Sequence, residues 1–249
     1  MSTLRPALAD LLAYLGEMGY GDLYLDPPRR AASVAMPVLK EAPSPQVVPP
    51  APALLDEEAT GRSGELAALA GAVAACTRCR LAEGRHKAVF GSGNPNADLM
   101  FIGEGPGAEE DRQGLPFVGA AGELLTRIIQ AIDLTRDDVY IANVVKCRPP
   151  GNRDPQPDEV AACRGYLEKQ IALIRPRVIV ALGKVAAQAL LGNDSPIGRM
   201  RGQWHSVQGI PTMGTYHPAA LLRNAALKRP TWEDMQQVRD HLREFPENT

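Results

Sequence analysis

Short apolar runs alternate with segments of helical periodicity from residue 66 onward, and this alternation limits the fold more than any other feature of the chain. The runs "DLMFIG", "DVYIANVV" and "RVIVAL" have the length and composition of buried strands. The segments "AGELLTRIIQAI", "PDEVAACRGYLEKQIALI" and "KVAAQALL" have the spacing of helices, and a strand around "PTMGTY" and a C-terminal helix from about Trp232 to Glu244 follow. The pattern predicts an α/β fold with a mainly parallel sheet that helices cover on both faces.

In such a sheet, the loops that carry chemistry gather at the carboxyl ends of the strands. Three loops of unusual composition stand at those places: "GEGPG" (103–107), "KCRPPGNR" (146–153) and "YHPAALLRN" (216–224). We therefore expect these three loops to lie close together in the folded protein.

The N-terminal part of the chain differs in composition from the rest. Leucines recur at helical spacing within residues 1–25, which predicts a short amphipathic helix. Residues 26–65 form a Pro/Ala-rich segment, with eight prolines between residues 27 and 54, and this composition is typical of an extended linker. We expect the folded domain to span residues 66–249 and the appended helix to dock on a protein partner.

Membrane insertion and secretion are not expected. No apolar run approaches the ~18 residues that cross a bilayer, and the N-terminus lacks a signal-peptide pattern, so a cytoplasmic protein is predicted. The net charge is −2, yet residues 195–232 contain no Asp or Glu and hold Arg199, Arg201, Arg223, Lys228 and Arg229. This local excess suits contact with a polyanion, with a solvated loop face as the alternative.

All four cysteines belong to one pattern, a C-x2-C pair (Cys76 and Cys79) and a C-x15-C pair (Cys147 and Cys163). A reducing compartment disfavours structural disulfides, and a redox pair would account only for the first two cysteines. Four thiolates fit either a structural zinc ion or a 4Fe-4S cluster, and the spacing does not separate these two. Unrelated core positions are the alternative for Cys147 and Cys163.

The glycine loop differs from known phosphate-binding loops. A dinucleotide-binding loop reads G-x-G-x-x-G, whereas Gly103, Gly105 and Gly107 are each two residues apart. The acidic residues 109–111 would repel a pyrophosphate, and the loop has no G-K-[ST] for a nucleoside triphosphate. Its backbone N–H groups suit the polar edge of a base better than a phosphate.

Several motifs together carry a specific resemblance. "GEGPGAEED", "PFVGAAG", "NVVKCRPPGNR" and "YHPAALLRN", in this order and with the four cysteines, resemble the family 4 uracil-DNA glycosylases over essentially all of residues 70–245. The resemblance implies a three-layer α/β/α sandwich, cleavage of the N-glycosidic bond of deoxyuridine in DNA, and a 4Fe-4S cluster on Cys76, Cys79, Cys147 and Cys163.

The same resemblance implies a role for each site residue. Phe117 would stack on the extruded uracil, and Asn143 would read the base, because an amide can donate to uracil O4 and accept from N3–H. His217 would lie beside uracil O2, where a preorganised donor is worth about 3–4 kcal/mol. The implied substrate-binding set is Gly103, Glu104, Gly105, Phe117, Asn143 and His217, with His217 and Glu104 as the catalytic pair.

One departure from better-known uracil glycosylases concerns the general base. Those with a "GQDPY"-type loop carry an aspartate where this chain has Gly105 and a methyl-excluding tyrosine where it has Gly107. We therefore expect a dissociative mechanism, in which the bond breaks first and a water then captures the sugar; the group that activates the water is not assigned. Leu221 would fill the gap left by the flipped base and Arg223 would contact phosphate, with a helical core role for "AALL" as the alternative.

The expected function is that of a monomeric base-excision repair enzyme. It would flip deoxyuridine out of single- or double-stranded DNA, hydrolyse the N-glycosidic bond and release free uracil. The alternative is a catalytically silent nucleic-acid-binding module with a structural metal site, which would bind DNA but leave no abasic sites. A nucleotide hydrolase would need phosphate-binding and metal-binding motifs that the sequence lacks.

Overall fold

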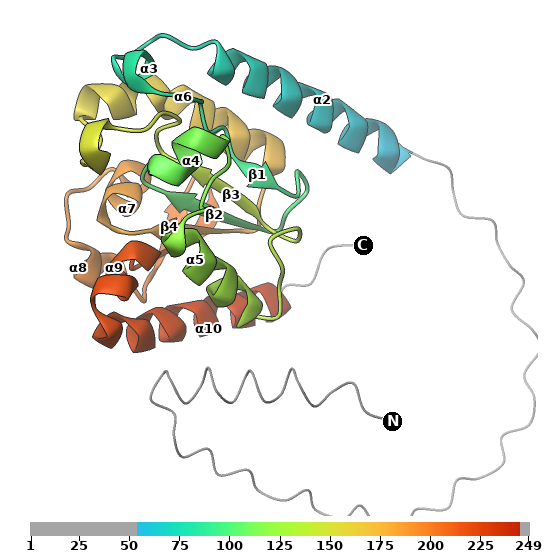
Figure 1. The fold of residues 1–249 in the computed structure, drawn as a ribbon. Coiled ribbons are helices and arrows are strands. Elements are labelled where there is room, and N and C mark those ends of the chain that lie inside the picture. Colours follow the sequence, from blue (N-terminus) through green and yellow to red (C-terminus); the bar gives the residue numbers. More distant parts are fainter. Residues whose placement is uncertain (1–53, 245–249) are drawn as a thin grey trace, which may run out of the picture. The chain divides into compact units, whose positions relative to one another are not determined.

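The computed structural model describes residues 54–244 of the 249-residue chain (Figure 1). The predicted helix of residues 1–25 and most of the predicted linker lie outside the described residues. Within residues 54–244, no helix is both long and apolar enough to cross a membrane.

A six-stranded sheet forms the centre of this part of the chain, in the order β1-β3-β2-β4-β6-β5 (Figure 1). Its four inner strands run parallel, and the two outer strands are antiparallel to their neighbours. The strands are β1 (Ser92–Gly93), β2 (Leu99–Gly103), β3 (Tyr140–Asn143), β4 (Val178–Leu182), β5 (Trp204–Val207) and β6 (Ile210–Thr215). The prediction of a mainly parallel sheet is confirmed.

The inner strands divide their side chains between two cores, one on each face of the sheet. Met100 and Ile102 of β2 pack in one core with residues of α6 and α7. Leu99 and Phe101 of the same strand pack in the other, with residues of α5 and α10. The covering helices are α6 (Pro157–Ile174), α7 (Lys184–Leu191), α5 (Ala120–Gln130) and α10 (Lys228–Glu244). The protein is therefore a three-layer α/β/α sandwich, as predicted.

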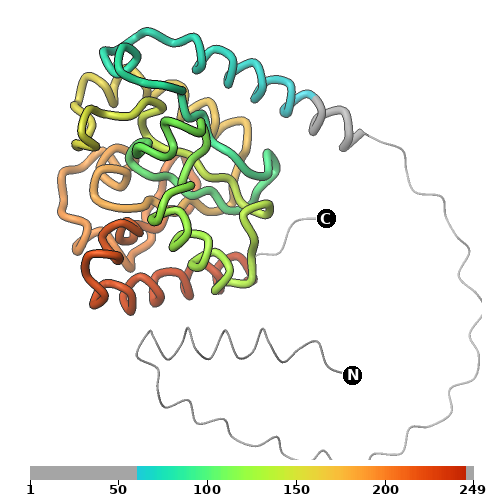
Figure 2. The backbone as a smooth tube through the Cα atoms, in the orientation of Figure 1, coloured from blue at the N-terminus to red at the C-terminus, as the bar shows by residue number. Residues whose placement is uncertain are grey.

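A long helix, α2 (Leu54–Ala74), precedes the sheet and packs along α6; Figure 2 shows its path. Leu66 and Val73 are its buried residues among those whose side chains are described. The predicted boundary between linker and domain falls inside this helix, since residues 54–65 are helical in the structure. The helix has no pronounced apolar stripe, so its periodicity did not reveal it.

Short elements flank the functional loops and complete the fold. They are α3 (Leu81–Gly84), α4 (Ala108–Gln113), η1 (Pro150–Asn152), α8 (Ile197–Met200), α9 (Pro218–Arg223) and η2 (Ala225–Leu227). Three of them, α4, η1 and α9, belong to the loops that follow β2, β3 and β6, at the carboxyl ends of these parallel strands.

Candidate active site

The loops that follow β2, β3 and β6 converge on one cavity of about 490 Å³. Glu104 and Gly105 line it from the first loop, Asn152 and Arg153 from the second, and His217 from the third. This convergence confirms the proximity that the sequence predicted for the three loops.

Gly103, the last residue of β2, supports the back of the cavity because it has no side chain. It pairs with Asn143 of β3 in parallel register. A Cβ atom at Gly103 would lie 2.5 Å from Asn143 Oδ1 and 2.6 Å from the ring of Phe117, so a larger residue would displace one of them. Apart from Gly103, every residue of the predicted substrate-binding set lines the cavity.

The first two loops also pack directly against each other. The backbone N–H of Val145 donates to the carbonyl oxygen of Glu104 at 3.1 Å, which continues the strand pairing beyond the end of β2. A Cβ atom at Gly105 would lie 2.8 Å from Val145 Cγ2. The glycine at this position therefore permits the close approach of the two loops.

The side chain of Asn143 is buried, yet its Oδ1 has no hydrogen-bond partner in the described chain. An unpaired buried polar group costs about 1–3 kcal/mol, and native proteins keep few of them without a functional reason. Because Asn143 lines the cavity, its Oδ1 is available to a donor on a bound ligand.

Phe117 has an unusual backbone conformation. Its φ is +52°, in the left-handed region that costs a residue other than glycine about 1–3 kcal/mol. The side chain is buried, and its ring centroid lies 5.6 Å from that of His217 at an interplanar angle of 31°. A planar ligand in this cavity can stack on Phe117 while His217 contacts its edge.

His217 presents a neutral hydrogen-bond donor. It caps the N-terminus of α9, where its Nδ1 accepts a hydrogen bond from the backbone N–H of Ala219 at 3.1 Å. Because Nδ1 accepts, the ring proton lies on Nε2, which can then donate. Burial, together with the positive charge of Arg223, lowers the pKa of His217 to about 4, so the ring is uncharged near pH 7.

The carboxyl group of Glu104 titrates close to neutral pH. Burial and the negative charge of Asp154 raise its pKa to about 7, while Lys184 acts in the opposite direction. Lys184 Nζ lies 3.3 Å from Asp154 Oδ2. A carboxyl group with this pKa can take up or release a proton under physiological conditions. The sequence did not reveal Asp154 and Lys184 as neighbours of Glu104, because they follow different strands.

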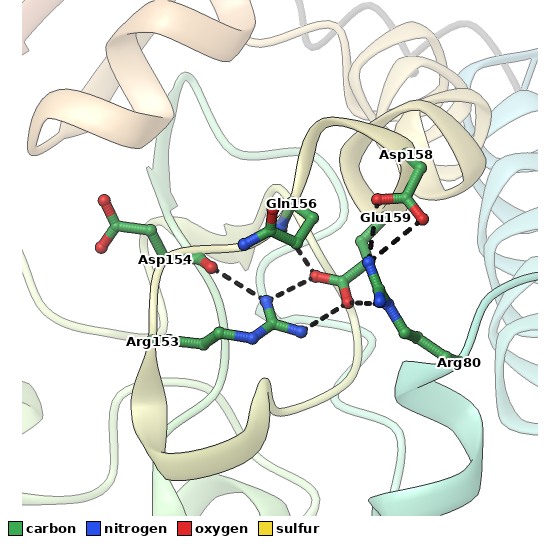
Figure 3. Close-up of polar contacts among 6 residues, drawn as sticks. All are labelled: Arg80, Arg153, Asp154, Gln156, Asp158 and Glu159. Atoms are coloured by element: carbon green, nitrogen blue, oxygen red, sulfur yellow. Dashed lines mark hydrogen bonds and ion pairs between the residues drawn. The ribbon is translucent and has the colours of Figure 1, made fainter.

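A buried carboxylate joins the cavity wall to the segment that carries the C-x2-C pair (Figure 3). Glu159, in the first turn of α6, accepts from Arg153 at 2.7 and 2.8 Å, from Arg80 at 3.0 Å and from the backbone N–H of Gln156 at 2.8 Å. The hydrogen bonds from Arg153 contribute most to lowering the pKa of Glu159 to about 2. Arg153 lines the cavity and Arg80 follows Cys79, so Glu159 links the two regions.

Leu221, for which the resemblance implied a DNA contact, is buried: its side chain is 3% exposed and packs in the core with α5 and α10. This burial favours the helical core role that the sequence left open for "AALL". Leu222 is 50% exposed, because successive side chains of a helix point about 100° apart. Arg223 lines the cavity.

The four cysteines gather around a second, much smaller cavity of about 10 Å³. All four are free thiols. They come from three places in the chain: the turn after α2, the end of the β3 segment and the helix α6. The structure therefore brings together the C-x2-C and C-x15-C pairs, which are far apart in the sequence.

The surroundings of these thiols suit a thiolate-bound group. Arg85 Nη1 donates to Cys147 Sγ at 3.1 Å, and the backbone N–H of Lys146 donates to Cys163 Sγ at 3.3 Å. Such N–H groups stabilise negative charge on sulfur. Within residues 54–244, no three potential ligands already stand in metal-binding geometry. The donor set, four sulfurs around one small cavity, thus fits a four-thiolate site.

Comparison with known proteins agrees with this site. The family model of the uracil DNA glycosylase superfamily matches residues 90–236. The type-4 uracil-DNA glycosylase of Sulfurisphaera tokodaii is 46% identical over 177 residues, which cover 68% of this chain and 80% of that protein. The type-4 uracil-DNA glycosylase of Thermotoga maritima is 45% identical over 174 residues, covering 68% of this chain and 90% of that protein.

A more distant relative shows how specific the match is. The type-5 uracil-DNA glycosylase of Pyrobaculum aerophilum is 32% identical over 163 residues, covering 59% of this chain and 71% of that protein. The identity to the type-4 proteins is higher and extends over more residues. The chain therefore belongs to the uracil-DNA glycosylase superfamily and, within it, to the type-4 uracil-DNA glycosylases.

Proposed function

We propose that this protein is a uracil-DNA glycosylase that extrudes deoxyuridine from DNA and hydrolyses the bond between base and sugar. The observation that carries the proposal is the buried, unpaired Oδ1 of Asn143, in a cavity that His217 and Phe117 also line. The similar type-4 proteins are named for this activity. All of these residues belong to one chain, so we propose that the active enzyme is a monomer.

Recognition of the base follows from the chemistry of the amide. Asn143 Oδ1 accepts from uracil N3–H, and Nδ2 donates to uracil O4. Cytosine offers an acceptor at N3 and a donor at the neighbouring position, so both contacts would oppose like groups. A site that hydrogen-bonds its substrate in this way rejects a mismatched base strongly, because buried groups on both sides lose their partners.

Bond cleavage is assisted by charge stabilisation. When the N1–C1′ bond breaks, its electron pair stays with the base, and negative charge grows on uracil O2. The Nε2–H of His217 donates to this oxygen without giving up its proton, since the neutral ring suffices as a donor. One preorganised donor of this type contributes about 10²–10³-fold to the rate. Phe117 keeps the base flat against the wall while the bond lengthens.

The sugar cation that remains is captured by a water molecule. Glu104 is the carboxyl group of the cavity wall whose pKa is raised to about 7, so its carboxylate is partly ionised at neutral pH and can accept the proton of that water. The proton moves from water to Glu104, and the new C1′–O bond gives the abasic sugar. This assignment extends the catalytic pair of His217 and Glu104 to a specific role for each residue.

DNA would reach the cavity along α9. Arg223 lines the cavity and can contact a phosphate next to the flipped nucleotide. The exposed Leu222, rather than the buried Leu221, is the apolar side chain that can enter the space left by the base. An apolar wedge matters only where a stacked partner must be replaced, so its effect should be larger on double-stranded than on single-stranded DNA.

We further propose that the four cysteines hold a 4Fe-4S cluster. A bound cluster would supply a crosslink between segments that are distant in the sequence. The N–H donors of Arg85 and Lys146 would then stabilise the negative charge on two of the ligating sulfurs. Glu159 would keep the C-x2-C segment in place through Arg80.

The direct test is the excision reaction. A labelled oligonucleotide with one uracil is incubated with the protein and treated with alkali, and strand scission at the uracil is measured. We expect scission at uracil and none at cytosine or thymine in matched oligonucleotides. Binding of the same DNA without any scission would favour the alternative of a silent nucleic-acid-binding module.

A further inference from the structure

Phe117 keeps its left-handed backbone because several groups fix the peptides around it. Glu110 Oε1 accepts from the backbone N–H groups of Val118 and Gly119 at 2.9 and 3.1 Å. Its Oε2 accepts from the N–H of Gly107 at 3.1 Å. One carboxylate thus ties the residues that follow Phe117 to the glycine loop.

The carbonyl groups on the other side are held by a residue outside every motif of the sequence. Arg136, in the connection between α5 and β3, donates from Nη2 to the carbonyl oxygen of Pro116 at 2.9 Å. Its Nη1 donates to the carbonyl oxygen of Phe117 at 3.2 Å and lies 3.3 Å from Thr126 Oγ1. The guanidinium group therefore fixes two successive peptides at the residue with positive φ.

The surroundings of Arg136 favour this local role. Its guanidinium is half-buried, and burial lowers its pKa. No carboxylate oxygen among the described side chains forms an ion pair with it, and its hydrogen bonds go to two backbone carbonyls and one hydroxyl group. Gly122 lies directly against the same peptide. A Cβ atom there would lie 1.9 Å from the carbonyl oxygen of Phe117, so a larger residue would displace that peptide.

We propose that Arg136 is a positioning residue for base stacking, which acts on excision through Phe117. This inference rests on the proposed function and gives it one more determinant. Without Arg136, the peptides at residues 116 and 117 lose their donors, and Phe117 can leave the strained conformation. The ring of Phe117 would then leave its position beside His217, whose ring centroid lies 5.6 Å from that of Phe117. Arg136 does not line the cavity, so it should act on the reaction only through the placement of the base and not by contact with the reacting atoms.

A double-mutant cycle tests the proposal. Single-turnover excision is measured for the wild type, Arg136→Met, Phe117→Ala and the double variant. We expect Arg136→Met to slow excision by about ten- to a hundredfold, the range of a misplacement of about 1 Å. In the Phe117→Ala background, the same substitution should change the rate by less than about twofold, because coupled residues are not additive. Equal losses in both backgrounds, or no loss in either, would overturn the inference.

A matched control separates positioning from general destabilisation. Arg177 is also a partly buried arginine that donates to a backbone carbonyl, that of Leu242 at 3.1 Å, but it lies next to the amino end of β4. Arg177→Met should leave the excision rate within about twofold of wild type, as expected for a distant, independent site. If Arg136→Met does not fold, Arg136→Lys carries the same cycle. Arg136→Lys should slow excision less than Arg136→Met, and this slower rate must likewise be absent when Phe117→Ala is the background.

A readout without catalysis completes the test. Hydrogen exchange of the Val118 and Gly119 amides should be faster in Arg136→Met than in Arg177→Met, because the loop is released. Failure of the wild type to excise uracil would reject the proposed function. A wild type that excises uracil, with additive effects of Arg136→Met and Phe117→Ala, would reject only the role of Arg136.

Discussion

The ammonium group of Lys146 donates to the backbone carbonyl oxygen of Asn143 at 2.8 Å, at a place where the lysine side chain is almost fully buried. Its Nζ also bonds to Gln170 Oε1, and its backbone N–H donates to Cys163 Sγ. The turn that presents Asn143 to the cavity is thus the turn that packs against the cysteines. Disturbance of the cysteine site should therefore displace Asn143, the residue proposed to recognise the base.

Replacement of a cysteine should therefore affect stability first and excision as a consequence. We expect the protein purified without oxygen to be brown, and Cys163→Ser to lose visible absorption and iron and to unfold at a lower temperature. Ala161→Ser, on the exposed face of the same helix, is the matched control and should retain all three properties. Zinc in place of iron in the wild type would contradict the cluster assignment. Iron content, absorption and thermal unfolding are the measurements.

Asn143→Asp should change which base is removed. The carboxylate presents an acceptor to uracil O4, and two opposed acceptors cost at least about 1–3 kcal/mol, so uracil excision should fall about tenfold or more. Cytosine offers a donor at that place, and a protonated aspartate can also donate to cytosine N3. We expect weak excision of cytosine that increases at lower pH, measured by strand scission. Excision of uracil at the wild-type rate would show that base recognition lies elsewhere.

His217→Ala should slow the chemical step without weakening DNA binding. Loss of one preorganised donor should lower the single-turnover rate by about 10²–10³-fold, and the proposed phosphate contact is that of Arg223, not His217. Since the pKa of His217 is about 4, its protonation should not shape the pH profile between pH 5.5 and 8.5. His241→Ala, in the last turn of α10, is the control. Single-turnover rates and DNA affinity are measured side by side.

The pH profile should report Glu104. If its carboxylate accepts the proton of the water in the step that limits single turnover, only the ionised form is active, and burial raises its pKa to about 7. The rate should therefore rise with pH up to about 7 and level off above it. Glu104→Gln should lower the rate by about 10²–10⁴-fold and remove this dependence. A wild-type single-turnover rate that is constant from pH 5.5 to 8.5 would show that Glu104 does not act as the base in the rate-limiting step.

Leu221 and Leu222 offer a matched pair of variants. Leu222→Ala should lower excision from double-stranded DNA more than from single-stranded DNA, because the wedge acts only where a base must leave a stack. Leu221→Ala should lower the free energy of unfolding by about 2–5 kcal/mol, the usual cost of truncating a buried leucine. Its effect on excision should be equal for both substrates. The reverse pattern would restore the wedge role to Leu221.

The parts of the fold that the sequence predicted are those with strong local signals. The strands β2, β3 and β4 are continuous apolar runs between turn residues, and their burial follows directly from that pattern. The outer strands β1 and β5 are short and partly exposed, so no run of apolar residues marks them. The start of α2 was missed because prolines and alanines lead into it without an apolar stripe.

The sequence also predicted some parts of the candidate site and not others. It predicted that the loops after β2, β3 and β6 lie close together, because parallel strands end at one edge of the sheet. The register of α9 could not be predicted, since one residue separates the buried Leu221 from the exposed Leu222. Arg136 was not found either, because its role depends on a contact between segments that only the folded chain creates.

The unpaired oxygen of Asn143 also bears on how a catalytic cycle ends. If Asn143 recognises the N3–H and O4 groups as proposed, free uracil keeps both groups after its bond to the sugar is broken. The unpaired Oδ1 of Asn143 should therefore bind the product by the same contact as the substrate. Turnover should then be limited by the departure of uracil, and free uracil in the medium should act as a competitive inhibitor, whereas cytosine should not.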